Sequence, residues 1–82
     1  MTFIPTHPWP APVRVKQIRA NYPSRLGERP HTFVGRVHDR CRRLPTREAI
    51  RRELEQARAV FKREFGEVLD VTIDLENGEV IR

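Results

Sequence analysis

The fold is decided by residues 46–81, which read TREAIRRELEQARAVFKREFGEVLDVTIDLENGEVI. In the first part of this stretch, apolar side chains recur at a spacing that would place them on one side of a helix. These side chains are Ile50, Leu54, Ala57, Phe61 and Phe65. Thr46 is a suitable N-cap, and Gly66 stands where a left-handed C-terminal cap is expected. We therefore predict an amphipathic helix over residues 47–65.

Beyond Gly66 the hydrophobic period becomes two, which is typical of a strand with one buried face. The apolar side chains of this strand are Leu69, Val71, Ile73 and Leu75. The side chains between them are polar and belong on the opposite face; they are Asp70, Thr72 and Asp74. A second strand at residues 80–81 completes a β-hairpin, which we expect to pack on the long helix.

The turn of this hairpin contains the dipeptide Asn-Gly at residues 77–78, which favours a two-residue type I′ turn. That turn would pair Leu75 with Val80 and Glu76 with Glu79. Two glutamates that face each other repel mildly, so we expect nearby cations to relieve this pair.

The region before residue 31 contains a candidate strand and a loop. Residues 13–20 begin with alternating apolar and basic side chains, which suits a half-buried strand, although the alternation slips at Gln17. Residues 21–30 contain asparagine, glycine and two prolines, a composition that is typical of a loop.

Residues 32–44 fit two different structures. As a helix, they would gather their apolar side chains on one arc, with Thr32 as the N-cap and Pro45 just beyond the end. As a strand, they would place Phe33 and Val37 on the same face, and their β-branched content would help. We predict a short helix here.

The N-terminus is rich in proline, which removes backbone donors and favours an extended polyproline conformation. We therefore divide the chain into an extended proline-rich arm over residues 1–12 and a single small domain over residues 13–82. The predicted fold class is α+β. It combines a short antiparallel sheet that ends in the hairpin, one long amphipathic helix and a second short helix.

Composition limits the class of protein. With 82 residues, of which 38% are apolar and 33% charged, the chain suits one small soluble domain with a thin core. No run approaches the roughly 20 apolar residues of a membrane-spanning helix, and the N-terminus lacks the features of a secretory signal. A single cysteine excludes an internal disulfide. We expect a cytoplasmic protein that does not bind membranes.

Positive charge is concentrated in the first part of the chain. The net charge is +5, from 16 Lys and Arg against 11 Asp and Glu. Residues 1–47 carry ten cations and two acids, whereas residues 48–82 carry six cations and nine acids. This asymmetry would attract a polyanion, although an arginine-rich composition or a need for solubility would also produce it.

A basic stripe on the predicted long helix is the strongest functional signal. It consists of Arg47, Arg51, Arg58 and Lys62 and runs for about 22 Å. Three further cations of the preceding segment belong to the same candidate site: Arg36, Arg40 and Arg43. Guanidinium groups bind phosphate in a bidentate manner. We therefore predict a non-enzymatic binding or regulatory protein whose arginine-rich surface contacts the phosphates of a nucleic acid or nucleoprotein. A solvated helix face neutralised by its own ion pairs is the simpler alternative.

A second functional hypothesis is an inhibitor or adaptor that docks on an acidic protein surface. Its contacts would come from the proline-rich arm, the sheet edge, the basic surface and four side chains: Trp9, Tyr22, Arg25 and Arg29. A free sheet edge would also allow a homodimer.

Three residues resemble part of a metal or nucleophilic site. His31, His38 and Cys41 would lie broadly on one side of a helix, but a structural zinc site needs four ligands. A catalytic cysteine needs a positioned base and an oxyanion site, and no glycine-rich loop accompanies Cys41. We therefore assign Cys41 to packing and expect no catalytic residue, no metal and no cofactor.

Overall fold

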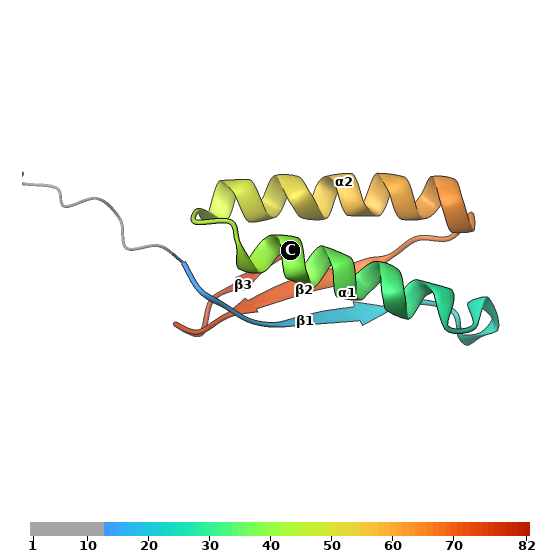
Figure 1. Cartoon of the computed structure of the whole chain (residues 1–82), viewed down its shortest axis with the longest axis horizontal. Coiled ribbons are helices and arrows are strands. Elements are labelled where there is room, and N and C mark those ends of the chain that lie inside the picture. The colour runs from blue at the N-terminus through green and yellow to red at the C-terminus, as the bar shows by residue number, and fades with distance from the viewer. Residues whose placement is uncertain (1–12) are drawn as a thin grey trace, which may run out of the picture.

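The computed structural model of the protein describes residues 13–82 (Figure 1), so the predicted arm and Trp9 lie outside the described residues. In chain order, the elements are β1 (Val15–Asn21), the short 3₁₀ helix η1 (Ser24–Leu26), α1 (Arg29–Arg42), α2 (Arg47–Phe65), β2 (Asp70–Leu75) and β3 (Val80–Ile81). The strands form one antiparallel sheet in the order β1-β2-β3. Both helices lie on the same side of this sheet (Figure 1), which confirms the predicted α+β class.

Helix α2 has the predicted bounds because both of its end signals operate as expected. The Thr46 hydroxyl accepts a hydrogen bond from the Ala49 amide at 3.1 Å, as an N-cap does. At the other end, Gly66 has a φ of 70° and donates its amide to the Lys62 carbonyl at 2.8 Å. A residue with a Cβ is strained in this left-handed conformation, so glycine favours the end of the helix here.

Helix α1 is confirmed as a helix, but its predicted start was wrong. It begins at Arg29, with Glu28 as the N-cap residue, so Thr32 lies inside the helix. Pro30 occupies the first turn, where the amide that proline lacks would have had no helical partner, and it is buried. The second proline of the predicted loop therefore starts a helix, and the loop itself contains η1.

The core fills the space between the two helices and one face of the sheet. Its apolar side chains are at most 3% exposed: Val37, Cys41, Ile50, Leu54, Ala57, Phe61, Leu69, Val71, Ile73, Leu75 and Ile81. The ring centroid of Phe61 lies 4.4 Å from that of Phe65, 5.4 Å from that of Phe33 and 6.3 Å from that of Tyr22. The predicted apolar stripe of α2 and the predicted inner face of β2 are thus both buried in one core.

A β-bulge in β1 explains why the alternation of its side chains slips. Val15 pairs with Leu75 and Gln17 pairs with Asp74, so Lys16 is an extra residue in the ladder. The apolar side chains on either side of the bulge stay half-buried on the helix side. Lys16 and Gln17, although consecutive, are both exposed and both border the open face of the sheet.

The predicted register of the hairpin was wrong by one residue. Val80 pairs with Asp74 instead of Leu75, and the Leu75 amide donates to the Glu79 carbonyl at 2.8 Å. Glu79 therefore faces Leu75, and the predicted pairing of Glu76 with Glu79 was wrong as well.

Backbone conformation explains the longer turn. A type I′ turn needs a positive φ at both of its central residues. Gly78 has a φ of 93°, but no residue other than glycine has a positive φ within residues 13–82, so Asn77 does not take the first of these positions. The Gly78 amide donates to the Leu75 carbonyl at 3.1 Å and closes a three-residue loop.

Burial of the last strand explains the observed register. Ile81 is 3% exposed and belongs to the core, whereas Val80 is 51% exposed on the open face. Because side chains alternate along a strand, the predicted register would have moved Ile81 into solvent and turned Arg82 toward the core.

Candidate functional site

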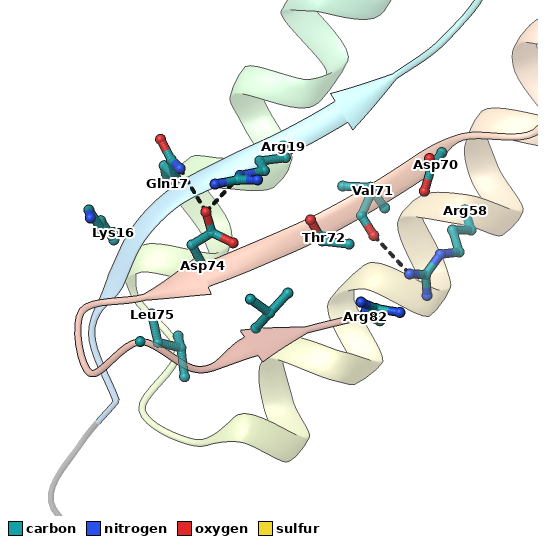
Figure 2. Close-up of a pocket in the computed structure, with 12 residues that line it drawn as sticks. Lys16, Gln17, Arg19, Arg58, Asp70, Val71, Thr72, Asp74, Leu75 and Arg82 are labelled. Atoms are coloured by element: carbon teal, nitrogen blue, oxygen red, sulfur yellow. Dashed lines mark hydrogen bonds and ion pairs between the residues drawn. The ribbon is translucent and has the colours of Figure 1, made fainter.

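The face of the sheet opposite the helices contains a cleft of about 600 Å³ (Figure 2). Side chains from β1, β2 and α2 and from the end of β3 line it; the charged ones are Lys16, Arg19, Arg58, Asp70, Asp74 and Arg82. The cations outnumber the carboxylates by four to two. The open face is therefore polar and carries an excess of positive charge.

Asp74 is the best-connected charged residue of this cleft. Asp74 is only 8% exposed, and its Oδ2 accepts a hydrogen bond from Nε2 of Gln17 at 2.6 Å. Nε of Arg19 lies 2.8 Å from the same oxygen. The Gln17 hydrogen bond, helped by the positive charges of Arg19 and Lys16, outweighs partial burial and lowers the pKa of the Asp74 carboxyl.

These contacts predict that Asp74 makes stability depend on acid pH. Because the pKa of Asp74 is lower in the folded protein than its ordinary value of 3.8, its contribution is complete above pH 3.8. That contribution is lost as the pH falls through the folded-state pKa. We expect Asp74→Asn to be less stable than wild type in urea unfolding at neutral pH, with the difference shrinking at pH values below 3.8. A difference that stays constant down to strongly acid pH would contradict this role.

Arg58 caps the edge of β2 where its partner strand ends. Strand β3 ends at Ile81, so the Val71 carbonyl has no strand partner on that side. Nη2 of Arg58 donates to this carbonyl at 2.9 Å from helix α2 (Figure 2). Arg58 is therefore partly buried, and its guanidinium both closes the sheet edge and borders the cleft.

The other cations of the α2 stripe lie on the same side of the helix but differ in their partners. Arg47 forms a bidentate ion pair with Glu79 of the hairpin, which lowers the pKa of the Glu79 carboxyl. Arg51 and Lys62 are exposed, and neither forms an ion pair within residues 13–82. The stripe thus faces the β3 side of the sheet. Arg47, at its first end, is paired with a carboxylate, whereas Lys62, at its last end, forms no ion pair within residues 13–82.

The cations of α1 belong to a different surface. Arg40 forms an ion pair with Glu53, which lies on the opposite flank of α2 from the stripe. Arg36 borders a small pocket between the two helices beside Phe65, and Arg43 lies just beyond the end of α1. The structure therefore does not bring these three residues together with the α2 stripe.

The side chains predicted to bind a protein partner make contacts within the domain. Tyr22 is half-buried against the aromatic core, and Arg25 forms an ion pair with Glu67. Cζ of Arg29 lies 5.4 Å from the ring centroid of Phe65. The fourth predicted contact, Trp9, lies outside the described residues.

Cys41 is a core residue. It is fully buried, and burial, with help from the negative charge of Glu53, raises the pKa of its thiol to about 11. A thiol with so high a pKa is almost entirely protonated near neutral pH and is a poor nucleophile.

His31 is exposed at the start of α1, and His38 carries a buried Nε2 without a hydrogen-bond partner in the described chain. No cluster of three or more His, Cys, Asp or Glu suited to a metal occurs within residues 13–82.

Three cations of the cleft were missed by the sequence analysis: Lys16, Arg19 and Arg82. Arg19 could have been found from the sequence, because it occupies a polar position of the half-buried strand predicted over residues 13–20. Lys16 reaches the cleft through the bulge, and the position of Arg82 depends on the hairpin register, so neither could be placed from the pattern.

Comparison of the chain with protein families, with curated proteins and with solved structures found no match. Within residues 13–82, neither helix has the length and apolar character needed to cross a bilayer.

Proposed function

We propose that the protein binds nucleic acid through phosphate contacts, using one continuous basic surface. This basic surface runs from the β3-facing flank of α2 around the sheet edge to the cleft. It comprises Lys16, Arg19, Arg51, Arg58, Lys62 and Arg82. The observation that carries the proposal is the convergence of cations from α2, β1 and the end of β3 on the open face of the sheet.

The balance of ion pairs supports a polyanionic partner. All 16 Lys and Arg lie within the described residues, and only four of them form an ion pair with a carboxylate there. Of the six cations of the basic surface, only Arg19 is in such a pair. The remaining charges are available for phosphate oxygens, which guanidinium and ammonium groups bind strongly.

The distribution of apolar side chains favours phosphate contacts over a protein interface. The centre of a protein interface is usually apolar and poor in charged residues. Among residues 13–82, the only large hydrophobic residues that are well exposed are Val68 and Val80. Tyr22, Phe33, Phe61 and Phe65 pack together on the helix side of the sheet, so the described open face has no aromatic ring on which a base could stack. We therefore expect binding with little sequence preference.

The test is the salt dependence of binding to fluorescein-labelled oligonucleotides, followed by fluorescence anisotropy. If all six cations contact phosphates, affinity should fall on the order of 10³-fold between about 50 and 200 mM salt. Arg51→Gln combined with Lys62→Gln should reduce the slope of log affinity against log salt by about two. Both side chains are exposed, so this double variant should keep its thermal stability.

Two outcomes would contradict the proposal. The first is wild-type protein that does not bind single-stranded RNA, single-stranded DNA or duplex DNA at low salt. The second is a partner that survives nuclease treatment in a pull-down and is lost when residues 1–12 are removed, which would support the adaptor hypothesis instead.

A further inference from the structure

We infer that Arg19 is the central phosphodiester-binding residue of the cleft, and that the buried Asp74 carboxylate holds it in the conformation that binds. This inference rests on the proposed function: within the basic surface, Arg19 and Asp74 are the part that is already ordered before a ligand binds.

The geometry of the Arg19–Asp74 ion pair leaves the outer edge of the guanidinium free. The pair joins Nε of Arg19 to Oδ2 of Asp74, and the Arg19 side chain is 69% exposed. Neither of its two terminal nitrogens donates a hydrogen bond within residues 13–82. Two parallel N–H groups on one guanidinium edge match two oxygens of a phosphate.

Arg47 pairs with its carboxylate in a different way. Its Nε and Nη2 bind the two carboxylate oxygens of Glu79, so one N–H of a terminal nitrogen is used for the ion pair. At Arg19 the contact with Asp74 is made through Nε. Both terminal nitrogens of Arg19 therefore keep their N–H groups for a ligand.

Asp74 is itself fixed, so it can serve as an anchor. It lies on β2, the central strand, and Gln17 of β1 donates to the oxygen that Arg19 contacts. Holding a long side chain in its binding conformation reduces the entropy that binding would otherwise cost. Asp74 is thus a positioning residue that acts through Arg19.

Other groups of the cleft fit the same ligand. Lys16 is close enough for its charge to lower the pKa of Asp74, and Arg82 lines the other side of the cleft with Arg58 (Figure 2). A phosphate on the free edge of Arg19 would therefore share the cleft with two further exposed cations. The β-bulge, which brings Lys16 onto this face, is part of the site.

The test uses two variants that remove the same charge from the same face. Asp74→Ala and Asp70→Ala each take one carboxylate from the cleft, so both should strengthen polyanion binding if only the overall field matters. Asp70 forms no ion pair within residues 13–82. If Asp74 positions Arg19, Asp74→Ala should bind an oligouridylate about two- to tenfold more weakly than wild type. Asp70→Ala should bind equally or more tightly.

A second pair of variants covers the case in which Asp74→Ala folds poorly. Arg19→Lys keeps the charge but loses the guanidinium fork, whereas Arg36→Lys makes the same change on α1, away from the cleft. We expect Arg19→Lys to weaken binding about as much as Asp74→Ala, and Arg36→Lys to leave it unchanged. Thermal unfolding of each variant shows whether it is folded.

The outcomes separate this inference from the proposed function. Wild-type protein that binds neither the oligouridylate nor single-stranded or duplex DNA at low salt overturns both. Wild-type binding together with Asp74→Ala binding as tightly as wild type, or with Arg19→Lys binding normally, overturns the role of Arg19 and Asp74 and leaves the proposed function in place. Inorganic phosphate that competes as well as the oligonucleotide, at equal phosphate concentration, would show a site for the free ion instead of the polymer.

Discussion

Replacing Phe61 with alanine is expected to remove about 3–5 kcal/mol from the free energy of unfolding, because the phenyl ring is fully buried and its removal leaves a cavity in the core. Three other aromatic rings pack around it: Tyr22 just before η1, Phe33 of α1 and Phe65 of α2. A domain of this size has only a few kcal/mol of stability to lose. Most molecules of the variant should therefore be unfolded at room temperature, as followed by circular dichroism during urea titration.

Val68→Ala is the matched control for this loss. Val68 is apolar like Phe61 but is 68% exposed in the loop between α2 and β2, so its truncation should change stability by less than about 0.5 kcal/mol. A loss below about 1 kcal/mol for Phe61→Ala would mean that the aromatic rings do not pack as one unit.

The second large effect is expected at the cleft. Lys16→Gln combined with Arg82→Gln removes two exposed cations that line opposite parts of the site. If each makes a charge-assisted contact of about 1.5 kcal/mol, affinity for a single-stranded oligonucleotide at low salt should fall about a hundredfold. The measurement is fluorescence anisotropy, with thermal unfolding to confirm that stability is unchanged.

A second double variant tests whether position matters or only net charge. Arg52→Gln with Arg63→Gln also removes two positive charges, but from the exposed side of α2 that does not border the cleft. This control should lose much less affinity than the cleft variant. Equal losses would assign binding to the general charge of the protein and would contradict the location of the basic surface.

The elements that could be predicted from sequence are those whose signals are local. Helix α2 carries its cap residues and its apolar stripe within one continuous segment, so its bounds follow from residues 46–66 alone. The inner face of β2 follows in the same way from its period of two. Pro30 was misinterpreted because proline both ends loops and starts helices, and only tertiary contacts distinguish the two roles.

The candidate site depended on relations between distant segments. Whether Arg40 is free depends on Glu53 of another helix, and whether Arg58 is exposed depends on where β3 ends. The cleft itself requires the pairing of β1 with β2, which brings Gln17 beside Asp74 across 57 residues of chain. Residue spacing along a single helix contains none of this information.

The pairing of Asp74 with Val80 decides which side chains of β3 face the cleft, because residues that pair across two strands lie on the same face of the sheet. Burial of Ile81 favours this pairing, so Arg82 stands on the open face because its neighbour packs in the core. A polar residue at position 81 should therefore disturb the basic surface, although such a substitution removes no cation from it.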